Sequence, residues 1–179
     1  MPSRVTFSKE HPDIQELALY YDDVGKSLRL YFSPHSLSYE LRFDGYSRVE
    51  VESELSERLA ELEMESGLAV LSAIEAAFRV DYLQRCYLRR KDIVSRAFRS
   101  LHRRKEARVS LEDELLEIWN KHAPDASRLI ADLQRAFRFR HWLAHGRYWV
   151  PRFPTYDYLT IYSLAENVLR SFPLLGPDA

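Results

Sequence analysis

The sequence predicts a mainly α protein, a helical bundle with a small N-terminal β-hairpin appendage. Apolar residues recur every three to four positions through most of the chain after residue 51, and short connections separate these stretches, as in helical bundles. Over residues 37–51, by contrast, apolar and polar residues alternate one by one, which is typical of a strand. We therefore expect an N-terminal helix and β appendage over residues 1–51, a bundle over 52–173 and a tail over 174–179.

The first expected element is a helix that begins at Pro12 and Asp13. Proline is favoured in the first turn of a helix and aspartate at its N-terminal cap. Glycine is common just past a helix end, so we expect this helix to end at Gly25. Its apolar side consists of Ile14, Leu17, Tyr21 and Val24.

The β appendage is expected to follow this helix. Apolar residues alternate with polar ones over 37–43 and again over 49–51, on either side of a turn at Gly45. A loop with an odd number of residues, centred on Gly45, places the apolar residues of both strands on one face of the hairpin. The stretch 28–32 also alternates and is expected to add a third strand.

Five helices are expected after the hairpin, and they would form the bundle. The stretch 67–78 is apolar nearly all round, which indicates a central position. Ser110, with Asp113 three residues on, and Thr155 are typical N-terminal caps. The expected helices cover residues 52–90, 91–105, 110–122, 125–145 and 155–172.

The formal net charge of −1 hides a strong separation of charge along the chain. Residues 40–75 contain ten acidic and three basic side chains, whereas 79–108 contain eleven basic and three acidic ones. Residues 128–152 contain six arginines and one aspartate. For 79–108 two interpretations stay open: a solvated helix face, which the acidic segment of the same chain can neutralise, or a phosphate-binding surface. For 128–152 we predict phosphate binding, because arginine forms paired hydrogen bonds with phosphate.

Arg140 stands among the apolar positions of the expected helix 125–145. A guanidinium keeps its proton, so on a buried face it needs an anionic partner or a ligand. His145 follows five positions later, about 140° further around a continuous helix. The two side chains can therefore act together if the helix ends at His145, as Gly146 indicates, or if a second subunit completes a cleft.

The segment RHWLAHG, residues 140–146, resembles the R-x4-6-H motif of the HEPN superfamily, in which a polar residue such as His141 follows the arginine. The resemblance extends over about residues 50–172, and its specific part is 129–148. It implies a HEPN-like helical bundle and a metal-independent ribonuclease that dimerises, so that two motifs share one RNA-binding cleft. It also implies a place in a toxin–antitoxin or other defence system, with an antitoxin or a defence complex as partner.

Glu75 is the only charged residue in the apolar stretch 67–78. One interpretation is an ordinary ion pair with Arg79, one helical turn further on. The other is that Glu75 orients Arg140 or His145 from a neighbouring helix. The resemblance favours the second, because HEPN proteins often place an acidic residue on the helix that faces the motif.

The chemistry of RNA cleavage suits these residue types. RNA carries its own nucleophile, the 2′-hydroxyl, so an enzyme needs proton-transfer groups and a cation for the phosphorane charge. Histidine titrates near neutrality, and arginine offers fixed donors to the added negative charge. We assign His145 as general base or acid and Arg140 as the phosphate clamp, with a dimer supplying a second copy of each. The products would be a 2′,3′-cyclic phosphate and a 5′-hydroxyl, without metal or other cofactor.

Four residues near the motif or Glu75 are expected to bind RNA. Tyr148 follows the expected helix end and is the best candidate to stack on an unpaired base. The other three, which would contact phosphates, are Arg79, Arg138 and Arg147.

His141 and His145 are spaced as two imidazoles that share a metal on one helix face. However, no glutamate follows His141 as the H-E-x-x-H pattern requires, and the sequence offers no third ligand nearby. We therefore predict no metal, and expect His141 to line the cleft or to support the motif through hydrogen bonds.

Composition restricts the class of protein further. The single cysteine, Cys86, excludes an internal disulfide and a cysteine-based metal site, which suits a reducing compartment. The sequence shows no pattern of a signal peptide and no apolar stretch long enough for a bilayer. We expect a soluble cytoplasmic protein of one main domain that does not contact membranes.

Three functions remain open at this point. The first is the HEPN-type endoribonuclease. The second is a non-catalytic RNA-binding module of the same fold, which would keep its RNA affinity without Arg140 and His145. The third is a component of a protein complex, bound through the acidic segment and the β appendage.

Overall fold

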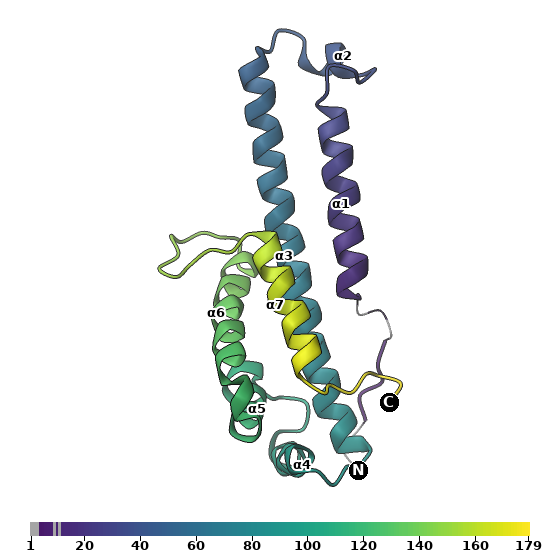
Figure 1. The fold of residues 1–179 in the computed structure, drawn as a ribbon, viewed down its shortest axis with the longest axis vertical. Coiled ribbons are helices and arrows are strands. Elements are labelled where there is room, and N and C mark those ends of the chain that lie inside the picture. Colours follow the sequence, from purple (N-terminus) through teal and green to yellow (C-terminus); the bar gives the residue numbers. More distant parts are fainter. Residues whose placement is uncertain (1–3, 9, 11) are drawn as a thin grey trace.

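The computed structural model describes residues 4–8, 10 and 12–179, and within these residues it contains helices and no strand. Figure 1 shows a helical bundle at one end and a two-helix arm that extends from it. The main helices are α1 (Ile14–Tyr31), α2 (Tyr39–Phe43), α3 (Arg48–Tyr87), α4 (Ile93–Lys105), α5 (Leu116–His122), α6 (Ser127–Ala144) and α7 (Tyr158–Ser171). Two short turns are η1 (Leu111–Leu115), of π type, and η2 (Pro124–Ala126), of 3-10 type.

Helix α3 is the spine of the molecule. It has 40 residues, and at about 1.5 Å per residue it is about 60 Å long. Its start is fixed by a capping box, in which Ser47 and Glu50 each accept a backbone N–H of the other. The N-terminal half of α3 forms the arm with α1, and its C-terminal half is surrounded by α4, α6 and α7 (Figure 1). One helix therefore belongs to both the arm and the bundle.

The core of the bundle forms where α3 is apolar on most sides, as expected for residues 67–78. Helix α7 crosses α3 closely at Gly67, where a Cβ atom would lie 2.7 Å from Cδ1 of Ile161. Large side chains of the core that are fully buried are Leu71, Ile74, Phe78, Tyr82, Phe98, Leu115, Leu116, Ile130, Leu133, Phe139 and Ile161.

The predicted β-hairpin is wrong. Residues 28–31 belong to α1, whose C-terminal cap is Phe32, residues 39–43 form α2, and residues 49–51 lie in the first turn of α3. The apolar residues pack at helical spacing, because Phe43 and Val51 join Phe32 in a small buried cluster at the tip of the arm. Leu41, which the hairpin would have buried, is 90% exposed.

The expected helix ends are partly confirmed. Asp13 caps α1 and Ser110 caps η1, each through its side chain, as predicted. Helix α1 continues past Gly25 to Tyr31, because Gly25 is buried in the helix interior and faces Leu62 of α3. Asp157, and not Thr155, caps α7, and its carboxylate accepts the backbone N–H of Thr160 at 2.7 Å.

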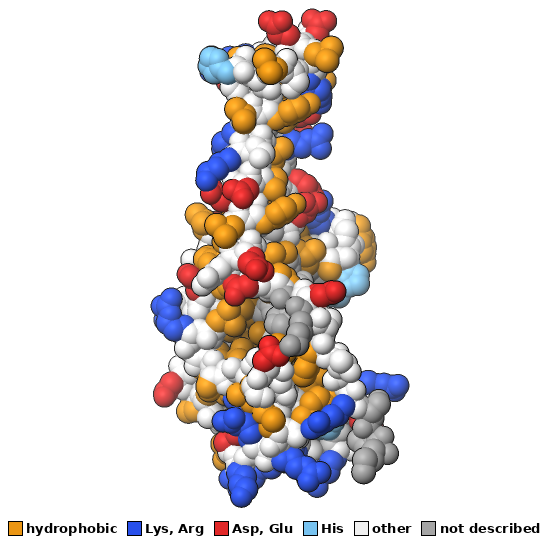
Figure 2. Space-filling model, turned by 90° about the vertical axis from the view of Figure 1, so that its right-hand side faces the viewer, with side chains coloured by type: hydrophobic (Ala, Val, Ile, Leu, Met, Phe, Trp, Pro, Cys, Tyr) orange, Lys and Arg blue, Asp and Glu red, His pale blue; other side chains and the backbone are white. Residues whose placement is uncertain are grey.

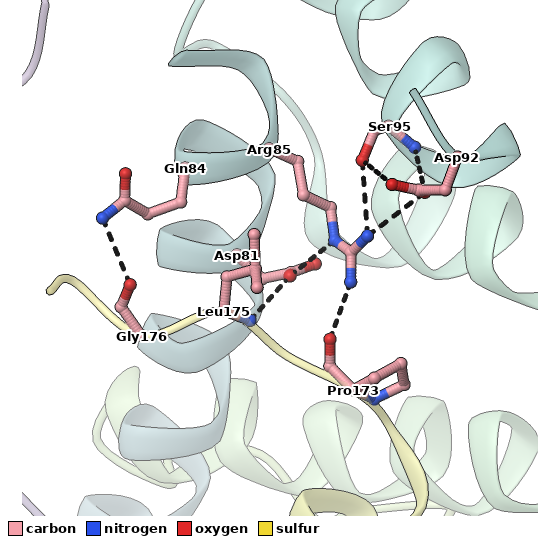
Figure 3. Close-up of polar contacts among 8 residues, drawn as sticks. All are labelled: Asp81, Gln84, Arg85, Asp92, Ser95, Pro173, Leu175 and Gly176. Atoms are coloured by element: carbon pink, nitrogen blue, oxygen red, sulfur yellow. Dashed lines mark hydrogen bonds and ion pairs between the residues drawn. The ribbon is translucent and has the colours of Figure 1, made fainter. Parts of the chain in front are cut away.

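A buried ion pair fastens the C-terminal segment to α3 (Figure 3). Nε of Arg85 donates to Asp81 at 2.7 Å, and both side chains are more than 90% buried. Nη2 of Arg85 donates to the carbonyl of Pro173 at 2.6 Å, and the N–H of Leu175 donates to Asp81 at 2.9 Å. Burial raises the pKa of Asp81, while these donors lower it. The segment expected to be a tail is therefore bound along α3.

The same arginine also connects the start of α4 to α3. Nη1 of Arg85 lies 3.2 Å from Asp92, the N-terminal cap of α4, and 3.3 Å from Oγ of Ser95 (Figure 3). Its guanidinium also lies 5.1 Å from the ring of Trp119. Arg85 thus joins α3, α4, α5 and the C-terminal segment.

None of the helices in the part of the chain that the structure describes has the length and apolar character that crossing a membrane requires.

Candidate active site

Glu75 joins two arginines where α6 packs on α3. Nη2 of Arg140 lies 2.9 Å from Oε2 of Glu75, and Nε of Arg79 lies 2.8 Å from Oε1. Glu75 therefore forms the expected ion pair with Arg79 and also contacts Arg140 on the neighbouring helix. Nε of Arg140 also lies 3.4 Å from Oγ of Ser72, whose own hydroxyl donates to the carbonyl of Leu68 at 2.8 Å. These contacts fix the position of the Arg140 guanidinium.

An open pocket lies beside this ion-pair cluster. Its walls come from α3, from η1 and from the C-terminal half of α6. Its volume is about 320 Å³, and it is lined by Glu75, Arg79, Ser110, Leu111, Glu112, Asp113, Phe137, Arg140 and His141. Nη1 of Arg140 has no hydrogen-bond partner among the described residues, so this donor is available to a ligand.

Glu112 belongs to the pocket, although the sequence did not indicate it. Burial raises its pKa, and the neighbouring carboxylates Asp113 and Glu75 raise it further, against the opposing effects of Arg138 and His141. In the sequence Glu112 is the first of three acidic residues in a helical turn capped by Ser110, a common surface pattern. Its role depends on the packing of η1 against α6, which local sequence does not reveal.

His141 and His145 lie together at the end of α6. Helix α6 ends at Ala144, His145 is its C-terminal cap, and Gly146 has a φ of 77°. This confirms the helix end that Gly146 indicated. The ring centroids of His141 and His145 are 4.2 Å apart, at an interplanar angle of 52°. His141 lines the pocket, whereas His145 does not.

Among the described residues, the polar contacts of Arg140 and the ring contact of His145 are with other side chains and not with each other. His141 stands between them, because it lines the pocket beside Arg140 and contacts the ring of His145. The functional groups therefore follow one another in a row, which begins at the Glu75–Arg140 ion pair, continues through His141 and ends at the exposed His145.

Arg147 holds the loop after α6 against α3. Its two Nη atoms each lie 2.8 Å from the carboxylate of Glu61, and Nη1 lies 3.1 Å from Sδ of Met64. Its φ of 56° is unusual for a residue with a side chain, which indicates a position fixed by these contacts. A phosphate would have to compete with Glu61 for this guanidinium.

The other residues expected to bind RNA differ in how exposed their side chains are and in how many protein contacts hold them. Tyr148 is 84% exposed and meets the ring of Trp149 edge to face at a centroid distance of 4.6 Å. Trp149 is itself anchored, because its carbonyl accepts Nε1 of Trp142 at 2.7 Å. Arg138 is exposed on α6 near Glu112, and Arg79 is held by Glu75 and by the carbonyl of Val109.

The described residues offer no metal site. They contain no group of three or more histidine, cysteine or carboxylate side chains arranged to hold a metal ion. Cys86 is buried, and burial raises the pKa of its thiol to about 12, so the thiol stays protonated at neutral pH. The ionisable side chains that line the pocket are carboxyl, guanidinium and imidazole groups.

Comparison of the chain with family models, with curated proteins and with solved structures finds no match.

Proposed function

We propose that this protein is a metal-independent endoribonuclease of HEPN type. The observation that carries the proposal is the fixed position of Arg140. Its guanidinium is held by Glu75 and Ser72 at the wall of an open pocket, one residue before a pair of histidines that are in ring contact. A prearranged cation beside groups that transfer protons is the combination that phosphoryl transfer from RNA needs.

In the proposed reaction the 2′-hydroxyl of RNA attacks the adjacent phosphate. The free donor of Arg140 binds a phosphate oxygen and stabilises the charge that develops on the phosphorane. His145 removes the proton of the 2′-hydroxyl or protonates the leaving 5′-oxygen, and His141 positions the ring of His145. The bond between phosphorus and the 5′-oxygen breaks, which leaves a 2′,3′-cyclic phosphate and a 5′-hydroxyl.

The proposal includes a homodimer with the motif at the interface. Two proton transfers need two groups, and His145 lies outside the pocket that contains Arg140 of its own chain. A second copy would supply the other imidazole. The loop after α6 supports an interface here, because Val150 is 87% exposed.

The cellular role is proposed from the resemblance of the motif to HEPN ribonucleases. It is RNA cleavage in the cytoplasm as part of a toxin–antitoxin or other defence system. The arm supports a partner such as an antitoxin or a defence complex, because apolar side chains near its tip are exposed: Leu37 to 107%, Leu41 to 90% and Val49 to 74%.

One observation favours the alternative of a non-catalytic RNA-binding module. The pocket contains three carboxyl groups, from Glu75, Glu112 and Asp113, and carboxylates repel phosphate. If they exclude the scissile phosphate, the protein binds RNA elsewhere and does not cut it.

A cleavage assay separates the two functions. Labelled single-stranded RNA is incubated in EDTA with the wild-type protein, Arg140→Ala, His145→Ala and, as a control, His35→Ala, whose imidazole is exposed between α1 and α2. We expect the first two substitutions to lower the cleavage rate by about 10²–10⁴-fold and the control to leave it unchanged. RNA binding without cleavage by the wild-type protein would favour the non-catalytic module.

A further inference from the structure

A second basic surface lies at the end of the bundle opposite the arm. Figure 2 shows arginine and lysine side chains gathered at this end of the molecule. Five of the six residues around a pocket there carry cationic or imidazole side chains, and the sixth is Cys86. The five are Arg89, Arg96, Arg99, His102 and Arg103, from α4 and the turn that precedes it. We refer to these five as the basic pole.

The acidic segment of the chain does not neutralise the basic pole. The acidic residues from Glu50 to Glu65 lie on the N-terminal half of α3, whereas the basic pole adjoins its C-terminal end. Among the described residues, no arginine of the basic pole forms an ion pair. Nearby pairs use Arg85, which is internal, and Lys105, which binds Glu114 at 2.7 Å. Among the described residues, the acidic segment therefore forms no ion pair with the basic pole, and both a solvated helix face and a phosphate-binding surface stay open for it.

Several features of the basic pole are unfavourable for the folded chain, although His102 and Arg103 stand in the last turn of α4, where the helix dipole favours cations, and Arg99 donates to the carbonyl of Arg90. Arg96, Arg99 and Arg103 are spaced by three and four residues, so they share one face of α4 and repel one another. Arg96 also stands in the first turn of α4, where the helix dipole disfavours a cation. Arg89 has a φ of 49°, which is unfavourable for a residue with a side chain. A bound polyanion would remove this repulsion.

We infer that the basic pole binds the phosphate backbone of RNA, as a surface separate from the Arg140 pocket. That the polymer is RNA rests on the proposed function. The cationic groups are mostly arginines, which bind phosphate through two parallel donors and stack on bases. The two surfaces are joined through the ion pair of Lys105 and Glu114, since η1, which contains Glu114, forms a wall of the Arg140 pocket. RNA held at the basic pole would be retained close to the site of cleavage.

The test measures binding with RNA that cannot be cleaved. A single-stranded oligonucleotide with 2′-O-methyl groups is titrated with the wild-type protein and with the triple variant Arg96→Gln, Arg99→Gln, Arg103→Gln. The control is Arg29→Gln, Arg48→Gln, Arg58→Gln, which removes three charges from exposed positions on the arm. Circular dichroism verifies that each protein is folded.

We expect the slope of log affinity against log salt to fall by about 2 in the triple variant, because each phosphate that the protein no longer neutralises lowers the slope by about 0.7. That corresponds to about a 100-fold loss of affinity at 0.1 M salt if the proteins bind equally at 1 M. An unchanged slope, or an equal loss in the arm control, would overturn the inference. The inference would also be overturned if the triple variant lost its binding to phosphatidylserine vesicles but kept the RNA affinity of the wild-type protein. Binding through the basic pole by a protein that cuts no RNA would leave this inference standing and refute the proposed function.

Discussion

Glu75 of α3 and Arg140 of α6 form an ion pair of 2.9 Å across the interface of the two helices. The Glu75 side chain is 18% exposed and that of Arg140 is 32% exposed, so the pair is partly shielded from water. Because Glu75 binds Arg79 as well, its carboxylate cannot rotate without breaking one of the two contacts. Arg140 is thereby held toward the pocket before any ligand arrives.

Glu75→Gln tests this positioning. The variant keeps the shape of the side chain but loses its charge, so Arg140 and Arg79 are held less firmly and are less neutralised. We expect the rate of cleavage to fall by about 10²-fold, since small displacements of a catalytic group have effects of this size. RNA affinity should stay the same or increase.

Glu57→Gln, an exposed position on the same helix, serves as the control. Single-turnover rates and dissociation constants, measured separately, distinguish positioning from binding. A parallel loss of rate and affinity in Glu75→Gln would contradict a positioning role.

Glu112→Gln tests the electrostatics of the pocket through stability. Burial raises the pKa of Glu112 above its ordinary value of 4.5, so the ionised form is less favourable in the folded chain than in the unfolded one. Glu112 therefore contributes stability below pH 4.5 that is lost as the pH rises through its folded pKa. We expect the free energy of unfolding of Glu112→Gln, relative to wild type, to be higher at pH 7 than at pH 4.

Urea unfolding at the two pH values provides this comparison, with Glu117→Gln at an exposed position as the control. The stability of Glu112→Gln relative to wild type could instead be the same at both pH values, or greater at pH 4. Either result would show that burial does not disfavour the ionised form of Glu112.

Tyr148→Ala tests the stacking role of the loop after α6. The ring is almost free of protein contacts and is open to an unpaired base. Loss of one stacked base weakens binding by about 1–3 kcal/mol, so we expect the dissociation constant for single-stranded RNA to rise by about 5- to 150-fold. Tyr148→Phe retains the ring and should bind like wild type. Equal affinities of Tyr148→Ala and Tyr148→Phe would remove Tyr148 from the RNA-binding surface.

Arg85→Ala tests the buried network that fastens the C-terminal segment. The substitution leaves the carboxylate of Asp81 buried, and one of its oxygens, Oδ2, already has no partner among the described residues. Removal of one member of a buried ion pair costs about 3–5 kcal/mol of unfolding free energy. Urea unfolding measures this loss. Lys26→Ala, which breaks an exposed pair with Asp22, is the control, and a similar effect of both substitutions would contradict the account.

The helices of the bundle were predictable because their apolar periodicity and caps are local. Asp13 and Ser110 start elements where their cap chemistry indicates, and Gly146 follows the end of α6. The hairpin was mispredicted because residues four apart share a face in a helix as well as in a strand, so Tyr39 and Phe43 fit both patterns. The sequence did contain a helix signal there, the Ser47–Glu50 capping box at the start of α3.

The site was predictable only in part, for a different reason. Arg140 and Glu75 were indicated because each is a charge in an apolar pattern, and such a charge needs a partner. Glu112 was missed because it stands in a turn where acidic residues are common. That Arg147 is held by Glu61, 86 positions away, depends on the packing of the loop on α3. Contacts of this kind arise from tertiary structure and have no local signature.

The most direct test of the proposed function is the chemical nature of the ends left on RNA. Purified wild-type protein and His145→Ala are incubated with a pool of single-stranded RNA in EDTA, and the ends of the fragments are determined. We predict 2′,3′-cyclic phosphates and 5′-hydroxyls with the wild-type protein, and neither with His145→Ala. Fragments with 3′-hydroxyl ends, or cyclic phosphates that His145→Ala produces at the wild-type rate, would contradict the assignment of this site as a metal-independent ribonuclease.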